Sequence, residues 1–233
     1  MDPDRLARVA DVLGDVGGAP VLDRLVILCV DMLSVTGAVI AVIADGQHRG
    51  AVAVSDEAHG AVDDLQFSLG EGPCIAADRS VAPVLEPDLA SAVELWPAFV
   101  PAALGHGIQA AFAFPLRLGA VHVGVLTLYR DTPGDLDGTD LRDAISLTHI
   151  ATHLLLELEA DLVSGMLPDR LAEIVDHRAR VHQATGMIAA QIDVDVATAL
   201  IRLRAFAWSR DRSIGDVAAD VVARLLRFDD EAL

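Results

Sequence analysis

The β-strand patterns of this chain all lie before residue 131, and the pattern from residue 137 onward is helical. Four β-rich runs form two pairs, and a short turn that contains glycine joins each pair. The runs are residues 38–44 and 50–55, and then 110–116 and 120–130. Pairs of this kind, with Asp45-Gly46 or Leu118-Gly119 between them, are typical of β-hairpins. The first part of the chain must therefore build an antiparallel sheet.

Helical segments and one short strand surround these hairpins. The predicted helices cover residues 3–13, 21–34 and 137–162. Two more are predicted, one that starts in the loop SLGEGPCIAADRS and one at Trp96-Pro97 that ends near 105–107. A short strand is predicted at 81–85. Cys29 lies on the apolar stripe of its helix, so we interpret it as a small buried hydrophobe. Because helices must cover the faces of the sheet, this order predicts an α+β sandwich.

The helix predicted at 137–162 carries more apolar surface than one stripe. One set of residues repeats every three or four positions, as in a coiled-coil seam: Ala144, Leu147, Ala151, Leu154 and Leu158. A second apolar face consists of Ile145, Ile150, Leu155, Leu156 and Leu162. Either the helix is covered on two sides, by its own sheet and by the partner subunit of a homodimer, or it has a single wide core face.

The tail of the chain has no strand pattern. Gly165 and Pro168 interrupt the helical pattern, and three amphipathic helices follow. Asp193 or Asp195 can cap the second of them, and Ser213 can cap the third. The tail is therefore expected to form an all-α bundle of about sixty residues. The two expected domains are residues 1–162 and 168–228.

Charge is distributed unevenly between these two parts. The chain has 35 acidic residues against 17 basic ones, all of them arginine, and a formal net charge of −18. Residues 177–228 nevertheless hold eight arginines against five acidic residues. The asymmetry suggests two modules with different partners. With two cysteines, no secretory layout and no apolar run of the ~18 residues that span a bilayer, we expect a cytoplasmic protein without a membrane partner.

Patterns that carry enzyme chemistry are absent from the sequence. There is no nucleophile elbow, Walker A loop or HExxH motif, so we expect no catalytic residue, no metal, no cofactor and no enzyme. Cys74 lies near a helix start, where a thiol pKa can be lowered, and His149 and His153 are spaced as two metal or haem ligands. A redox or haem sensor is therefore an alternative to a structural cysteine and two solvated histidines.

Residues 20–160 resemble a GAF domain of the type found in actinobacterial regulators. The resemblance rests on four segments in a fixed order: the first hairpin, the loop LGEGPC at 69–74, WPAF at 96–99, and the second hairpin GIQAAFAFPLRLGAVHVGVLTLY at 107–129. It implies a sensory pocket between the sheet and its covering helices, usually for a small molecule. The cyclic-nucleotide signature and an obvious bilin-attachment cysteine are absent, and some GAF domains only dimerise, so the ligand is unknown.

The tail resembles an ANTAR domain, the RNA-binding module of transcription antiterminators. Three segments carry the family pattern: Gln183–Met187 (QATGM), Ala199–Ala207 (ALIRLRAFA) and Asp216–Ala218 (DVA). Membership implies binding to paired RNA hairpins that overlap a terminator in leader RNA. The residues expected to form the RNA site are Arg178, Arg180, Gln183, Ala184, Thr185, Gly186, Arg204 and Trp208. Many members have a basic residue where this chain has Thr185, so a phosphate contact from that position would be lost here.

Gly186 raises a separate question, because a glycine inside a helix costs about 0.5–1 kcal/mol relative to alanine. We interpret residues 184–186 as a small-residue patch that lets a neighbouring helix or an RNA backbone approach closely. The sequence thus predicts an RNA-binding antitermination regulator whose GAF domain senses a ligand or dimerises. The alternative is a signalling or dimerisation protein whose helical tail contacts protein and not RNA.

Overall fold

The structure is a computed structural model that describes residues 3–14, 20–44, 47–119, 121–163, 169–210 and 212–228. The chain divides into two compact units, residues 1–171 and residues 172–233. Each unit has its own core, so the two are treated separately below.

The first unit is built on a five-stranded antiparallel sheet with the strand order β2-β1-β5-β4-β3. The strands are β1 Gly37–Ala44, β2 Gln47–Val54, β3 Val84–Glu86, β4 Ala110–Leu118 and β5 Val121–Arg130. Both predicted hairpins are confirmed, and pairing of β1 with β5 joins them into one sheet. The turn residues Asp45-Gly46 lie outside the described residues. Gly119, in the second turn, has a φ of 61°, a left-handed conformation that glycine adopts readily.

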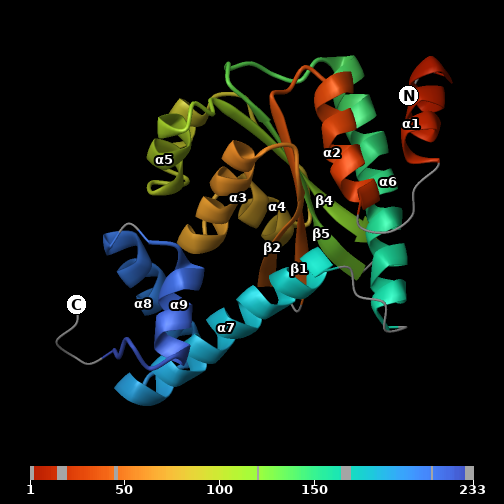
Figure 1. The fold of residues 1–233 in the computed structure, drawn as a ribbon. Coiled ribbons are helices and arrows are strands. Elements are labelled where there is room, and N and C mark those ends of the chain that lie inside the picture. The colour runs from red at the N-terminus through yellow and green to blue at the C-terminus, as the bar shows by residue number, and fades with distance from the viewer. Residues whose placement is uncertain are drawn as a thin grey trace. The chain divides into compact units, whose positions relative to one another are not determined.

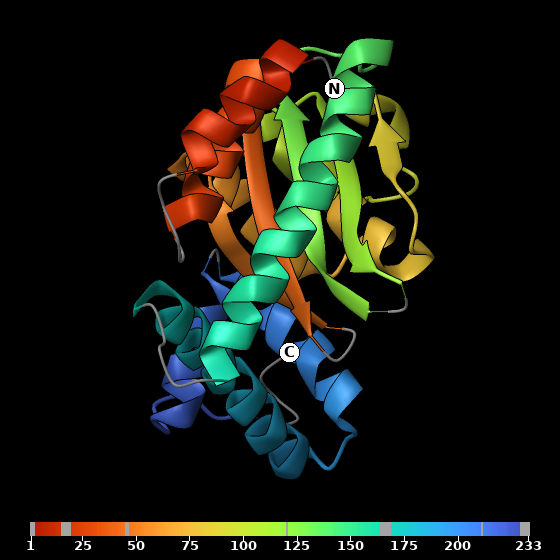
Figure 2. The same ribbon diagram turned by 90° about the vertical axis from the view of Figure 1, so that its right-hand side faces the viewer.

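Helices cover both faces of this sheet (Figures 1 and 2). They are α1 Pro3–Leu13, α2 Pro20–Met32, α3 Glu57–Leu69, α4 Pro73–Ser80, the 3-10 helix Leu89–Ala92, α5 Phe99–Gly105 and α6 Gly138–Val163. One face carries α1, α2 and α6, and the other carries α3, α4, α5 and the 3-10 helix. The sequence missed α3. Its buried side includes His59, Asp63 and Gln66, so the apolar repeat that marks a helix is interrupted there.

The central strands are buried on both faces. Along β5, Leu126 and Leu128 belong to the core shared with α2 and α6, whereas Val125 and Tyr129 face the opposite layer. Successive side chains of a strand alternate between the two faces of the sheet, which produces this division. Burial of a leucine of this kind contributes about 1.5–3 kcal/mol to folding. The sheet is therefore the element against which both helical layers pack.

The long helix α6 packs on the sheet and on α2 through residues of both predicted sets. Residues of both predicted sets lie in the same core, because Ala144, Leu147 and Ala151 are buried beside Leu155 and share their contacts with the sheet and α2. The predicted seam is therefore used inside the unit. Ile145 of the second set is 42% exposed, so cover by a partner subunit on that side stays a prediction. Figure 2 shows α6 lying across the sheet beside α2. Among the described residues, no helix combines the length and apolar character needed to cross a membrane.

In the part of the second unit that the structure describes there are three helices, as predicted. They are α7 Asp169–Ile192, which begins at the end of the first unit, α8 Val196–Ser209 and α9 Ile214–Val222. The cap of α8 is Asp195, whose side chain accepts a hydrogen bond from the Thr198 amide at 2.9 Å. Ser213 caps α9 in the same way, through the Asp216 amide at 3.0 Å. Gly165 and Pro168 lie outside the described residues.

The end of the described chain ties α7 to α8. The Phe228 amide donates to the side-chain oxygen of Gln191 on α7 at 2.9 Å, and the Phe228 ring lies 5.1 Å from that of Phe206 on α8. Phe228 is buried. These contacts close the bundle beyond the last helix.

Gly124 in β5 provides a test of how tightly the central strands fit. A Cβ at this position would lie 2.2 Å from the backbone oxygen of Ala41 in β1, and a backbone atom cannot move aside cheaply. We expect Gly124→Ala to lower the free energy of unfolding by roughly 2–3 kcal/mol, as overpacking does. Urea unfolding followed by circular dichroism measures the change. Gly138→Ala is the matched control, because an added Cβ there meets nothing within 4 Å; equal losses in the two variants would contradict the explanation.

Candidate functional site

Gln66, a buried glutamine on α3, forms hydrogen bonds that fix the loop between α3 and α4. Gln66 accepts a hydrogen bond from the Cys74 amide at 2.7 Å and donates one to the Tyr129 hydroxyl at 2.8 Å. Gly72 has a φ of 128°, and a Cβ there would lie 2.5 Å from the Gln66 side-chain oxygen. The glycines of the loop therefore form a turn that positions α4, and Gly72 leaves room for the glutamine.

Glu71, in the middle of the same loop, connects two of the sequence motifs. One carboxylate oxygen accepts hydrogen bonds from the amides of Ala98 and Phe99, at 2.7 and 2.9 Å. These amides belong to the start of α5, where backbone donors have no partner within the helix. A carboxylate at a helix start is also favoured by the helix dipole. LGEGPC and WPAF are thus in contact through one side chain.

A polar cluster lies under α3 and α4, against the sheet. Asp63, Gln66, Cys74, Thr127 and Tyr129 are all fully buried. Burial and the negative charge of Asp63 raise the pKa values of the Cys74 thiol and the Tyr129 hydroxyl well above their usual range. This is the layer in which the resemblance implies a small-molecule pocket. Within this layer Gln66 donates a hydrogen bond to the Tyr129 hydroxyl.

The redox and haem alternatives depend on the surroundings of the cysteines and of His149 and His153. The pKa of Cys29 is raised to about 12 by burial, and that of Cys74 is raised as well, so a low-pKa redox thiol is contradicted. His149 and His153 are both exposed on α6. Among the described residues, no three histidine, cysteine or carboxylate side chains gather as a metal site would require.

The segment QATGM on α7 presents two different faces. Ala184 and Thr185 are buried, and the Thr185 hydroxyl donates to the Val181 carbonyl at 2.7 Å. Gly186 is exposed, and a Cβ there would meet nothing within 4 Å. The prediction that Gly186 serves close packing against the second or third helix is therefore wrong. Its neighbours Arg180 and Gln183 are exposed as well.

On α8, the face opposite the core is apolar. Ala199, Leu203 and Ala207 are buried. On the other side, Ile201 is 63% exposed and Trp208 is 53% exposed, with the exposed Ala205 between them. We call these three residues the α8 stripe. Residues at i, i+4 and i+7 share one helix face, so this spacing was readable in the sequence once the core face was known.

Arginines flank the α8 stripe on both sides. By helical spacing, Arg204 borders it on one side and Arg202 on the other, and both side chains are half-buried. Two further arginines are engaged inside the unit: the Arg210 guanidinium lies 5.3 Å from the Phe206 ring centroid, and Arg212 pairs with Asp220 at 2.8 Å. The side chain of Arg178 lies outside the described residues.

Comparison with known proteins agrees with both resemblances. Residues 169–222 match the family model of the ANTAR domain. The first unit is similar to the GAF domain of a phosphoenolpyruvate-protein phosphotransferase from Acinetobacter, with a TM-score of 0.56, 17% identity, and coverage of 71% of this chain and 100% of that domain. The corresponding domain from Coxiella burnetii gives a TM-score of 0.54 and 15% identity over 70% of this chain and 96% of that domain.

A third solved structure, the GAF domain of the cyanobacteriochrome TePixJ, gives a TM-score of 0.50 and 16% identity over 63% of this chain and 94% of that domain. A comparison with curated proteins found no match to this chain. The first unit has the GAF fold. The helical tail is an ANTAR domain, so the chain has a GAF–ANTAR architecture.

Burial divides the predicted RNA site of the ANTAR domain. Ala184 and Thr185 lie in its core, so their side chains offer no surface to RNA in this structure. A phosphate-binding side chain in place of Thr185 would also extend from a buried part of the helix. The exposed members of the site are Arg180, Gln183, Gly186 and Trp208, with Arg204 half-buried. Ile201 and Ala205 of the α8 stripe lie on the same exposed face as Trp208, and the sequence interpretation did not include them.

The buried thiols of the GAF domain give a direct test. We expect a thiol reagent at pH 8 to modify neither Cys29 nor Cys74 in the folded protein, because both are buried and their raised pKa values keep them protonated. Both should react after unfolding in guanidinium. Mass spectrometry counts the modified thiols, and rapid native labelling of Cys74 would reinstate the redox alternative.

Proposed function

We propose that this protein is a non-enzymatic, cytoplasmic RNA-binding regulator of transcription antitermination. In this proposal the ANTAR domain binds paired hairpins in leader RNA that overlap a terminator. The GAF domain receives a signal or forms a homodimer. The proposal is supported by the ANTAR match over residues 169–222, and the observation that carries it is the exposed α8 stripe between two arginines.

The chemistry of the α8 stripe suits RNA hairpin loops. Unpaired bases in such loops stack on aromatic rings and on flat guanidinium groups. Trp208 offers an exposed indole, and Arg204 lies four residues earlier on the same side of the helix. Arg180 and Gln183 on α7 provide donors for phosphate oxygens. Within residues 177–228, eight arginines against five acidic residues favour a polyanion, although the whole chain is strongly acidic.

The same stripe supports a second candidate function. An isoleucine and a tryptophan that are both more than half exposed are also typical of a protein interface. The ANTAR domain would then contact protein, in a dimer or a partner complex, without binding RNA. The two candidates differ in what the stripe contacts, so one variant can separate them.

Binding to a two-hairpin RNA across a salt series tests the RNA function. We expect the affinity to fall steeply with salt. Trp208→Ala should weaken binding about tenfold, because stacking contributes roughly 1–3 kcal/mol per base, and it should leave the salt slope unchanged. Fluorescence anisotropy of labelled RNA measures both quantities.

Leu225→Ala is the matched control for Trp208→Ala, because Leu225 is 80% exposed in the same unit but is not part of α8. If both variants bind RNA like the parent while Trp208→Ala alone changes the sedimentation coefficient, the protein-contact function replaces the RNA function. The same conclusion follows if no two-hairpin RNA binds with salt-dependent affinity.

Gly186 allows stability and binding to be separated. Because a Cβ at this exposed helical position meets nothing, Gly186→Ala should raise the stability of the ANTAR domain by about 0.5–1 kcal/mol. If RNA approaches the helix closely there, the same methyl group should weaken RNA binding several-fold. Thermal unfolding and anisotropy give the two readouts. A variant that is more stable and binds RNA equally well would remove Gly186 from the RNA site.

The helix α6 is the natural route between the domains in this proposal. It packs on the GAF sheet through Ala144, Leu147 and Ala151, and the chain continues from its end at Val163 to α7 at Asp169. A signal that shifts α6 against the sheet would change how the ANTAR domain is presented.

A further inference from the structure

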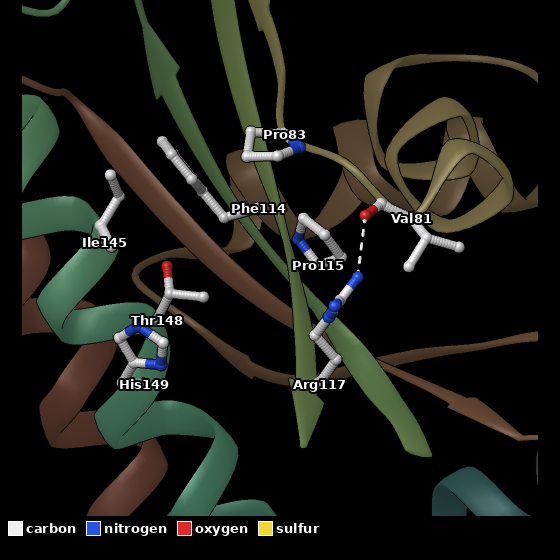
Figure 3. Close-up of a pocket in the computed structure, with 8 residues that line it drawn as sticks. All are labelled: Val81, Pro83, Phe114, Pro115, Arg117, Ile145, Thr148 and His149. Carbon is white, nitrogen blue, oxygen red and sulfur yellow. Dashed lines mark hydrogen bonds between the residues drawn. The ribbon is translucent and has the colours of Figure 1, made fainter. Parts of the chain in front are cut away.

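A pocket of the GAF domain lies between α6, β4 and the segment that follows α4. It has a volume of about 220 Å³. Three elements line it: β4 with Phe114, Pro115 and Arg117, α6 with Ile145, Thr148 and His149, and the segment 81–83 that leads into β3. Figure 3 shows these side chains around the space between α6 and β4.

The side chains that line this pocket are largely apolar. Phe114 is buried in the sheet, and Pro115 follows it within β4. Ile145 is 42% exposed, although it lies on a helix that otherwise turns its apolar face to the core. Cavities of about 150 Å³ already hold a benzene ring, so one ring with a small substituent matches the volume found here. The body of a fitting ligand is therefore a single apolar ring.

Arg117 is the charged side chain among the residues that line the pocket. The Arg117 guanidinium makes a long hydrogen bond of 3.3 Å to the Val81 carbonyl, and His149 lies across from it on α6. The Thr148 hydroxyl donates to the Ala144 carbonyl at 2.7 Å. The lining contains no carboxylate, in a chain with 35 acidic residues against 17 basic ones. This composition is complementary to an anion.

We propose that this pocket binds a small carboxylate with one apolar ring, and that Arg117 holds its charged group. The ring contacts Phe114 and Ile145. Because three lining residues belong to α6, the bound ligand contacts the helix that leads toward the ANTAR domain. The site is separate from the layer of Gln66 and Tyr129, and its existence does not depend on RNA binding.

Benzoate is the probe for this proposal, used with the full-length protein. We expect a saturable chemical-shift change at the Ile145 methyl group in a methyl-labelled sample. Benzyl alcohol, which keeps the ring without the charge, and acetate, which keeps the charge without the ring, should each bind at least about tenfold more weakly. Equal binding of benzoate and benzyl alcohol would overturn the anionic part of the proposal.

Three variants locate the binding site. Arg117→Ala should weaken benzoate binding about tenfold, since it removes the charge-assisted contact. Arg142→Ala is the matched control, an exposed arginine of α6 outside the pocket lining, and should bind normally. Ile145→Trp should fill the pocket and abolish binding, while the thermal unfolding midpoint shows that each variant is folded.

Three results would overturn the proposal. They are the absence of a saturable shift, unchanged benzoate binding by both Arg117→Ala and Ile145→Trp, and dissociation of a dimer by Ile145→Asp in sedimentation experiments. In the last case a second copy of the chain covers this face, and the pocket is part of an interface between subunits.

Discussion

The close pairing of β1 and β5 is the constraint on which the GAF domain depends. These two strands join the hairpins, and Gly124 lets β5 approach the backbone of Ala41 so closely that a methyl group would not fit. Both strands are buried on both faces, so the sheet is stable only when helices cover it on each side. The two helical layers, and therefore the two places where a ligand can be held, follow from this arrangement.

The two faces of the sheet carry different kinds of side chain. Under α3 and α4, polar side chains are buried, and Gln66 satisfies both the α4 backbone and the Tyr129 hydroxyl. A buried polar group without a partner costs about 1–3 kcal/mol, so such a network holds its members in one arrangement. Beside α6 the contacts are apolar and leave a pocket bordered by Arg117. One face therefore buries a polar network, and the pocket bordered by Arg117 lies beside α6.

In the ANTAR domain, buried and exposed residues are adjacent on the same helix. Thr185 forms its hydrogen bond inside the helix and is buried, whereas the adjacent Gly186 is exposed and contributes nothing to packing. The helix therefore keeps a residue that costs it stability at a position where nothing within the domain requires it. Gly186 and the exposed Trp208 on α8 both belong to the surface that we propose for RNA recognition.

The sequence by itself determined the elements whose signals are local. The two hairpins, the three helices of the tail and the caps Asp195 and Ser213 depend on turn residues, side-chain periodicity and nearest-neighbour hydrogen bonds. Contacts between distant residues decided the rest. Helix α3 was missed because its buried face is polar, and such a face is stable only against partners such as Tyr129, 63 positions away from Gln66. The apolar repeat of α6 predicted a helix but did not show which elements cover it. Spacing alone also did not show that Thr185 points into the core while Gly186 points out. Only the packed bundle determines which side of a helix faces its neighbours.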